Sequence, residues 1–511
     1  MPKHCLCLPF ALLALSLPAQ KIPAKLSPWP EAPVVYEYPG KAVFLFYDIF
    51  RNEAIVQAVE TDTAFAPLRQ VEAPRVSRGE LDAFTYIIGR QNDTAVTAYF
   101  IVDETDIWAY ELRLADFSIR NKKIITLDSK EYLLGGFIRG GKCGLLARRL
   151  GKKDSGQLLL FDDLSAAGPP REIPLSGDTR LLNKQYRPVV SGSAIEQAPK
   201  ALIANRTPAY WNEAFAGIGI EQPPHRAAAA DKIWFGRDAV WFSSDIQVKA
   251  ANGRAPAIEL NALYWSDLSF RTDTVHFTDV PNGAYSPQRG THVVFDDNLF
   301  SLYLRDDVMS LRVSDIGARN TLWQHELPAS PDTMDFFSSP VLLPKGVFNR
   351  EKEVLTADKF IAKFLKFTPF LQVRRDGTDY VLAIGGYQEN NGGGMVYTPG
   401  SPGVSTPYGA VAGTPGGWSM GGWGRSPSYT TTSSFYVVLH GDGQGPAGGI
   451  DHLPRVRYSN TLLGLVSDKV ENKAGKRNGG GLFGLFGRYW YGYYDQKERG
   501  YFMGGLELEK R

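Results

Sequence analysis

One serine of the sequence lies in a pattern that could support nucleophilic catalysis. Residues 417–421 (GWSMG) match the G-x-S-x-G pattern, and Asp442 and His452 follow Ser419 in the chain order that an α/β-hydrolase uses. A nucleophile elbow needs a buried strand before the serine and a helix after it, because these elements expose the hydroxyl and supply oxyanion donors. Glycine-rich sequence surrounds Ser419 instead. The sequence therefore does not support catalysis by this serine.

Other patterns for cofactor or metal chemistry are equally incomplete. Residues 479–484 (GGGLFG) satisfy G-x-G-x-x-G, but no predicted strand precedes them and no predicted helix follows, so we interpret them as a hinge. The densest group of possible metal ligands is His440, Asp442, Asp451 and His452, whose residue types suit zinc or another divalent ion. Their spacing matches no known ligand pattern, and a loop between strands explains the same residues. We predict no catalytic residue, no cofactor and no metal.

Acidic side chains offer a second possible chemistry. Glycoside hydrolysis needs two carboxyl groups about 5 to 10 Å apart across a cleft. Candidates are common, but each lies where a hairpin turn would place a solvated acidic residue, and the sequence cannot pair them. Carboxyl groups from different sheets that converge in one pocket, with one pKa raised by burial, would support this chemistry. The candidates are Asp103, Glu104, Asp106, Asp296, Asp297, Asp306 and Asp307.

Aromatic residues suggest binding rather than catalysis. Tyrosine and tryptophan present flat faces with a polar tip, which suits sugar rings or protein partners. Nine aromatic residues lie between Leu482 and Phe502, and they either contact a partner or fill both faces of a sheet edge. A further five have few apolar neighbours, and we predict that they bind a partner: Tyr397, Tyr408, Trp418, Trp423 and Tyr429.

The first twenty residues have the composition of a secretory signal peptide. Lys3 and His4 precede a leucine-rich stretch, and cleavage is expected after Ala19 or Gln20. Removal of this leader removes two of the three cysteines and leaves Cys143, so no intramolecular disulfide is expected. A large exported chain without disulfides is typical of bacteria. We therefore expect a periplasmic, outer-surface or extracellular protein.

Composition excludes several classes of protein. The chain of 511 residues is 43% hydrophobic and carries a formal net charge of +2, which excludes a disordered chain and gives no indication of nucleic-acid binding. It contains no apolar run of 18 residues that could span a membrane as a helix. The 52 glycines and 33 prolines favour many turns over long helices.

The hydrophobic pattern predicts antiparallel strands along most of the chain. From Val34 to about Leu343, short β-branched or aromatic runs alternate with turn residues every 8 to 12 positions or so. A single helix is predicted at Ala357–Lys366, where apolar residues recur at helical spacing after Thr356 and before Pro369. Its phenylalanines either pack on the body of the protein or, with the lysines, contact an anionic membrane.

These features predict four segments. Residues 1–20 are the leader, 21–384 a β-propeller-like body, 385–433 a flexible glycine-rich insertion, and 434–511 strands that complete the body. The range 385–449 alone contains 19 glycines, which leaves little apolar surface to offset the entropy of ordering.

About 25 to 28 expected strands without crossover helices are too many for one immunoglobulin-like sandwich, but they fit six or seven four-stranded blades. The chain thus resembles bacterial secreted β-propeller proteins in general over residues 34–510. Tandem β-sandwich domains are the alternative. In a propeller, Val34–Tyr38 and Tyr501–Leu508 are the natural strands to close the ring.

Two functions follow from this fold. The principal prediction is a non-enzymatic binding scaffold of the bacterial envelope that contacts an envelope protein or a glycan, because no catalytic set is assembled. The alternative is a carbohydrate-active enzyme that uses two unassigned carboxylates on a propeller. Blade number, oligomeric state and partner identity stay open.

Overall fold

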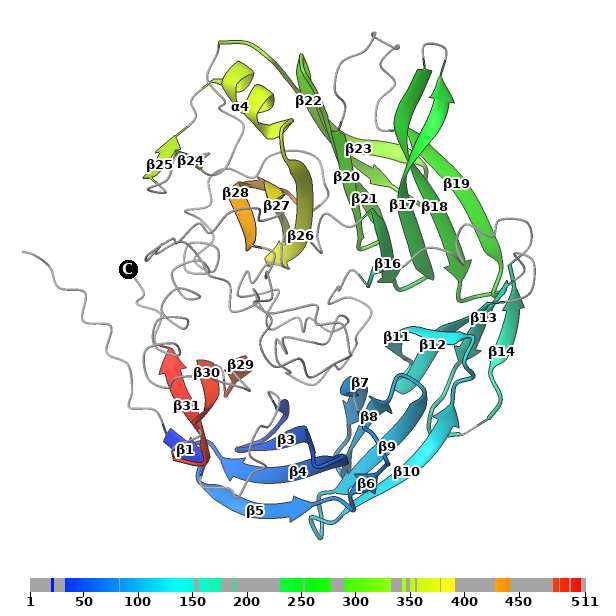
Figure 1. Ribbon diagram of the computed structural model, residues 1–511, viewed down its shortest axis with the longest axis vertical. Coiled ribbons are helices and arrows are strands. Elements are labelled where there is room, and N and C mark those ends of the chain that lie inside the picture. Colours follow the sequence, from blue (N-terminus) through cyan, green and yellow to red (C-terminus); the bar gives the residue numbers. More distant parts are fainter. Residues whose placement is uncertain are drawn as a thin grey trace, which may run out of the picture.

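The computed structural model describes most of the strand-forming sequence. The described residues are 20–22, 33–81, 83–150, 156–166, 168–175, 187–188, 230–250, 253–276, 289–331, 342–345, 350–353, 356–376, 378–390, 428–441, 481–486, 488–495 and 498–506. In these residues, seven sheets of three to five strands follow one another around a ring in chain order, as Figure 1 shows, and we number them as blades 1 to 7. The prediction of an all-β, propeller-like array with six or seven blades is therefore confirmed.

The first three blades are built from strands that are consecutive in the chain. Blade 1 contains β2 (Val34–Tyr38), β3 (Lys41–Phe50), β4 (Glu53–Asp62) and β5 (Pro67–Glu72), and β6 (Val76–Ser77) also pairs with β4. Blade 2 contains β7 (Phe84–Gln91), β8 (Ala95–Val102), β9 (Asp106–Arg113) and β10 (Ile119–Thr126). Blade 3 contains β11 (Glu131–Arg139), β12 (Lys142–Leu150), β13 (Gly156–Phe161) and β14 (Arg171–Pro174).

The next three blades repeat this order with small departures. Blade 4 contains β16 (Asp231–Phe235), β17 (Ala239–Ala250), β18 (Gly253–Tyr264) and β19 (Phe270–His276), and β15 (Arg187–Pro188) pairs with β16 in parallel. Blade 5 contains β20 (Arg289–Phe295), β21 (Asn298–Arg305), β22 (Val308–Asp315) and β23 (Asn320–Pro328). Blade 6 contains β26 (Thr368–Asp376), β27 (Asp379–Asn390) and β28 (Ser428–Leu439), and β24 (Leu342–Lys345) pairs with β25 (Arg350–Glu353) before it.

Blade 7 closes the ring with a strand from the other end of the chain. It contains β29 (Gly481–Leu485), β30 (Arg488–Asp495) and β31 (Gly500–Leu506), and β1 (Gln20–Ile22) pairs with β31. The prediction that Val34–Tyr38 closes the ring is wrong. Val34, Val35 and Tyr36 are buried in consecutive positions, as in an inner strand covered on both faces, and β2 pairs with β3 instead. The three-residue β1 is too short to give a strand pattern in the sequence.

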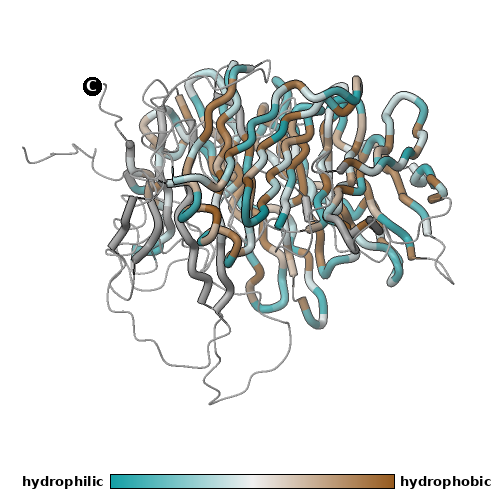
Figure 2. Tube along the Cα trace, turned by 90° about the horizontal axis from the view of Figure 1, so that it is seen from above, coloured by the Kyte–Doolittle hydropathy of each residue, from teal (hydrophilic) through white to brown (hydrophobic). Residues whose placement is uncertain are grey.

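Apolar side chains between neighbouring blades hold the ring together. One cluster of buried residues joins blades 7, 1 and 2, and another joins blades 4, 5 and 6 with the helix. Smaller clusters lie between blades 2 and 3 and between blades 3 and 4. In Figure 2, hydrophobic stretches run along the strands and hydrophilic stretches are frequent at the turns. The core is thus divided among the blade boundaries. A polar group buried at such a boundary is an exception to its apolar packing.

The single predicted helix is confirmed. α4 (Ala357–Phe364) buries Ala357, Phe360, Ile361 and Phe364, and Phe360 packs edge-on against Phe435 of β28 with ring centroids 5.3 Å apart. Thr356 occupies the N-cap position, but its side chain makes no capping hydrogen bond. The apolar face is therefore buried against blades 5 and 6, as the interpretation of a body-packed helix requires.

The glycine-rich insertion connects two paired strands. β27 and β28 pair up to Asn390 and Ser428, so both strands extend into the range 385–433 expected for the insertion. Residues 391–427 lie outside the described part of the chain. Among the described residues, no helix is long and apolar enough to cross a membrane.

Candidate active site

A buried polar patch interrupts the apolar boundary between blades 4 and 5. Strand alternation builds the blade 4 side, because Lys232 of β16 lies directly opposite Ser243 of β17, two pairs away from the pair of Trp234 and Trp241 and therefore on the same face. The tryptophan pair belongs to the apolar cluster, and Trp234 contacts Phe295 of blade 5 with ring centroids 5.1 Å apart. Lys232 and Ser243 continue the buried boundary with polar groups, at 2% and 1% exposure.

A histidine of blade 5 completes this patch. His292 lies in β20, is fully buried, and has its Nδ1 2.7 Å from Oδ1 of Asp245 on β17. With the proton on Nδ1, the imidazole donates to the carboxylate and is fixed in orientation and tautomer. The Asp245 side chain is 24% exposed, so solvent reaches the carboxylate side of the pair. We call Lys232, Asp245, Thr291 and His292 the Lys232 patch.

The lysine of the patch is anchored across the blade boundary. Its Nζ donates to the backbone carbonyl of His292 and to Oγ1 of Thr291, the latter at 3.3 Å. An ammonium group has three N–H donors, so these two acceptors leave one donor over within the described residues. The ammonium is therefore held in place without being fully satisfied.

Burial shifts the acid–base behaviour of both nitrogen bases. Desolvation lowers the pKa of Lys232 to about 8, although Asp245 acts in the opposite direction. Desolvation also lowers the pKa of His292 below its ordinary value, and the nearby Asp245 again opposes this shift. His292 is thus a neutral imidazole near pH 7, and Lys232 exchanges its proton close to physiological pH.

The second imidazole nitrogen of His292 gives this patch its possible chemistry. Nε2 of His292 is buried and has no hydrogen-bond partner among the residues that the structure describes. A buried polar atom without a partner costs about 1 to 3 kcal/mol. A neutral Nε2 accepts a hydrogen bond from an O–H group, and the spare N–H of Lys232 can donate to an oxygen. The patch therefore has the chemistry to hold a hydroxyl or water oxygen.

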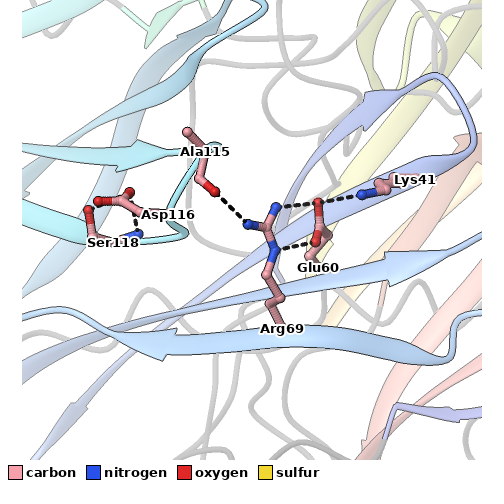
Figure 3. Close-up of polar contacts among 6 residues, drawn as sticks. All are labelled: Lys41, Glu60, Arg69, Ala115, Asp116 and Ser118. Carbon is pink, nitrogen blue, oxygen red and sulfur yellow. Dashed lines mark hydrogen bonds and ion pairs between the residues drawn. The ribbon is translucent and has the colours of Figure 1, made fainter.

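A different buried group shows what a structural ion pair looks like in this ring. Arg69 of β5 lies opposite Glu60 of β4 and binds both carboxylate oxygens, with Nε–Oε2 and Nη2–Oε1 distances of 2.6 and 2.9 Å. Lys41 adds a contact of 3.5 Å to Oε1, and Arg69 donates to the carbonyl of Ala115 in blade 2 at 3.3 Å (Figure 3). We call Lys41, Glu60, Arg69 and Ala115 the Glu60 network.

The polar groups of the Glu60 network are hydrogen-bonded to one another. The hydrogen bonds from Arg69 hold the pKa of Glu60 below its ordinary value, and the guanidinium also lies 4.7 Å from the ring centroid of Phe117. The neighbouring carboxylate of Asp116 is held in the same turn by the backbone and hydroxyl of Ser118 (Figure 3). The hydrogen bonds of Arg69 thus join blades 1 and 2, and both oxygens of Glu60 are already bound.

The acidic residues singled out from the sequence divide into two groups. Asp103, Glu104, Asp296 and Asp297 have positive φ angles, which confirms the hairpin-turn interpretation for them. Asp306 and Asp307 lie between β21 and β22 and were also expected in a turn. The expectation of a solvated carboxylate is wrong for Asp106, which is 2% exposed and pairs with Arg78.

One turn carboxylate has a raised pKa. Burial raises the pKa of Asp297, and the nearby carboxylates of Asp238 in blade 4 and Asp296 raise it further. The Nε1 of Trp241 donates to Asp297 at 3.0 Å and opposes the rise. Carboxyl groups of two blades therefore lie near each other, but Asp297 is already bound to the core tryptophan.

The predicted partner-binding residues are largely outside the described part of the chain. Tyr397, Tyr408, Trp418 and Trp423 fall in residues 391–427, and Tyr429 lies in β28 opposite Glu389. Their role in binding stays a prediction. Ser419, Asp442, Asp451 and His452 are also outside the described residues, whereas His440 is 59% exposed and lies 3.9 Å from Asp379. Among the described residues, no group of three or more acidic, histidine or cysteine side chains could hold a metal ion.

The aromatic residues near the C-terminus belong to the core where the structure describes them. Trp490 is 6% exposed and contacts Phe65 of blade 1 with ring centroids 4.6 Å apart. Tyr501 is fully buried and contacts Phe46 at 5.1 Å. These side chains therefore fill the boundary between blades 7 and 1, as the packing interpretation expects. In residues 479–484, the described part lies in strand β29, so the hinge interpretation is wrong for residues 481–484.

The residues of the Lys232 patch were missed in the sequence. Their signal is a charged or titratable residue inside a short apolar strand, as in DKIWF for Lys232 and RGTHVVF for His292. Each strand alone reads as an ordinary core strand with one polar position. Only the ring places the two strands side by side.

Comparison with known proteins gives a weak likeness in the solved structures. No family model matches the chain, and no curated protein matches it. Among the solved structures are apocarotenoid oxygenase of Synechocystis, with 11% identity and a TM-score of 0.26, and a chimera of this oxygenase (ACO) with RPE65, with 10% identity and the same TM-score. The match covers 58% of this chain and 61% of each of those chains, so the chain spans about three fifths of their length.

This finding corrects the principal functional prediction. The solved structures with this likeness are oxygenases, which are enzymes, and this conflicts with the prediction of a non-enzymatic binding scaffold, which we do not retain. A TM-score of 0.26 carries no argument about the reaction of this chain. The reaction has to be argued from the chain's own residues.

Proposed function

We propose that the protein is an enzyme of the acid–base class, in which His292 is the general base for an O–H group of water or substrate. The observation that carries this proposal is the buried Nε2 of His292, which lacks a partner among the described residues while Nδ1 is held 2.7 Å from Asp245. An imidazole base that is oriented by a carboxylate at one nitrogen and has no partner at the other activates hydroxyl groups in many unrelated folds.

The residues of the patch act in a defined order. The O–H group donates to Nε2 of His292, and the imidazole takes the proton. Asp245 accepts the hydrogen bond from Nδ1–H and stabilises the imidazolium that forms. The oxygen left behind is negative, and the ammonium group of Lys232 in the same patch stabilises it. Because burial lowers the pKa of His292, the base is already deprotonated at neutral pH.

A panel of ester, lactone, amide, aldehyde and ketone substrates tests this function on the purified chain. We expect turnover of at least one substrate class to fall by at least about 100-fold in His292→Gln, since a positioned general base contributes about 10² to 10⁴. Asp245→Asn should produce a similar loss, because it favours the wrong tautomer. His440→Gln is the matched control, since His440 is an exposed histidine of blade 6. Turnover that is the same in wild type and His292→Gln, or absent from the whole panel, would contradict the proposal.

We also propose that the protein is exported and that its leader ends at Ala19. Strand β1 begins at Gln20, and its Ile22 is fully buried in the cluster that joins blades 7, 1 and 2. Cleavage after Ala19 keeps all three residues of this strand, whereas cleavage after Gln20 shortens it. Mass measurement of the N-terminal peptide after expression in a bacterium should find Gln20 as the first residue of the exported chain. Retention of residues 1–19 on an exported chain would contradict this.

A further inference from the structure

Lys232 is placed in a way that the general-base role of His292 does not require. A cation that only stabilises negative charge can lie at the surface, where its hydration costs little. Lys232 is instead 2% exposed, within the boundary that also buries Trp234 and Trp241. Its Nζ is fixed by the His292 carbonyl and by Oγ1 of Thr291, so the amine lies within the patch of the oriented base.

Desolvation of this kind converts a lysine into a nucleophile. An amine attacks only in its neutral form, and an apolar environment favours that form over the ammonium ion. Burial lowers the pKa of Lys232 to about 8, against about 10.4 for a solvated lysine. At pH 7 its neutral fraction is therefore greater by about 200-fold.

We propose that Lys232 forms an imine with a small aldehyde or ketone substrate, and that His292 transfers the protons of this step. This inference rests on the proposed function, because the O–H group that His292 binds there is identified as the hydroxyl of the carbinolamine formed from that substrate. Such an adduct would contact two groups that lack a hydrogen-bond partner among the described residues. These groups are the third N–H of Lys232 and Nε2 of His292.

The step balances without an oxidant or reductant. The neutral amine forms a bond from Nζ to the carbonyl carbon, which leaves two protons on a positive nitrogen and a negative charge on the oxygen. His292 carries the first of these protons from the nitrogen to the oxygen, which becomes a hydroxyl. It then carries the second proton to this hydroxyl, which leaves as water when the C–O bond breaks and the nitrogen lone pair forms the C=N bond. The products are the imine of Lys232 and one water molecule. Asp245 stabilises His292 while it carries the proton.

Reductive trapping tests the inference on the full chain without a substitution. Acetaldehyde and sodium cyanoborohydride at pH 7 convert each imine into a stable ethylamine, and peptide mass spectrometry gives the initial rate at each lysine. Lys41 and Lys123 serve as internal references, since both side chains are 48% exposed. We expect Lys232 to be ethylated at least tenfold faster than either reference, because the larger neutral fraction outweighs its restricted access.

Matched variants separate this inference from the proposed function. His292→Gln should slow the ethylation of Lys232 by at least tenfold and leave Lys41 and Lys123 unchanged. If Lys232 reacts no faster than the references, the imine inference is wrong. The general-base proposal still stands in that case if His292→Gln abolishes turnover of a substrate in the panel. If Lys232 reacts fast and His292→Gln changes neither trapping nor turnover, the lysine is nucleophilic but the general-base proposal, and with it our mechanism, is wrong.

Discussion

The Glu60 network and the Lys232 patch are two buried polar groups at blade boundaries, and they are built in opposite ways. In the first, Arg69 occupies both oxygens of Glu60 and also reaches the carbonyl of blade 2. In the second, the histidine uses one ring nitrogen and leaves the other without a partner among the described residues. The first arrangement joins two blades by satisfying its charges. The second retains unsatisfied groups, which is a cost that packing alone does not explain.

The alkaline dependence of stability gives the largest expected effect. Folded Lys232 loses its proton near pH 8 and the unfolded lysine near pH 10.4, so the unfolded chain binds more protons in this window. The free energy of unfolding contributed by this group must then rise with pH, by about 3 kcal/mol in total. Urea denaturation from pH 7 to 10, with Lys232→Met as the reference, should show this rise as the difference between the two proteins. A difference that is constant or falls with pH would mean that Lys232 is not desolvated.

Removal of the Glu60 carboxylate should have the next largest effect. Glu60→Gln leaves Arg69 and Lys41 without their partner, and we expect a loss of about 2 kcal/mol in the free energy of unfolding. The difference should shrink as the pH falls through the lowered pKa of Glu60, because wild type then loses the same charge.

Its control is the double-mutant cycle with Arg69→Gln, measured by urea denaturation. Coupling close to zero between positions 60 and 69 would show that this pair does not stabilise the boundary between blades 1 and 2.

A glycine at the other end of the boundary between blades 4 and 5 sharpens the comparison further. A Cβ on Gly236 would lie 2.9 Å from Oδ1 of Asp297 and from the carbonyl of Ala239. We expect Gly236→Ala to destabilise the protein by about 1 kcal/mol, because it displaces the contact between Trp241 and Asp297. Thermal denaturation measures the loss. Catalysis by the Lys232 patch should not change, and a parallel loss of turnover would show that the whole boundary, rather than the patch, controls activity.

The sequence predicts the fold better than the site, for a physical reason. Strand alternation and turn residues are local, so the array of sheets and the helix at Phe360 and Phe364 follow from short segments. The closing strand does not, because three residues carry too little periodicity to be recognised. Nor does the site, since Asp245 and His292 are 47 positions apart and meet only where two blades pack.

The stability of Lys232→Met at pH 7 decides whether Lys232 is a desolvated charge that serves chemistry. We expect this variant to be more stable than wild type by about 2 kcal/mol, since methionine removes a desolvated charge at similar volume, and to lose the acid–base activity. Urea denaturation of both proteins under identical conditions gives the answer. A variant that is less stable than wild type and keeps its turnover would show that Lys232 is a structural charge of the ring, as Glu60 is, and that it has no role in acid–base chemistry.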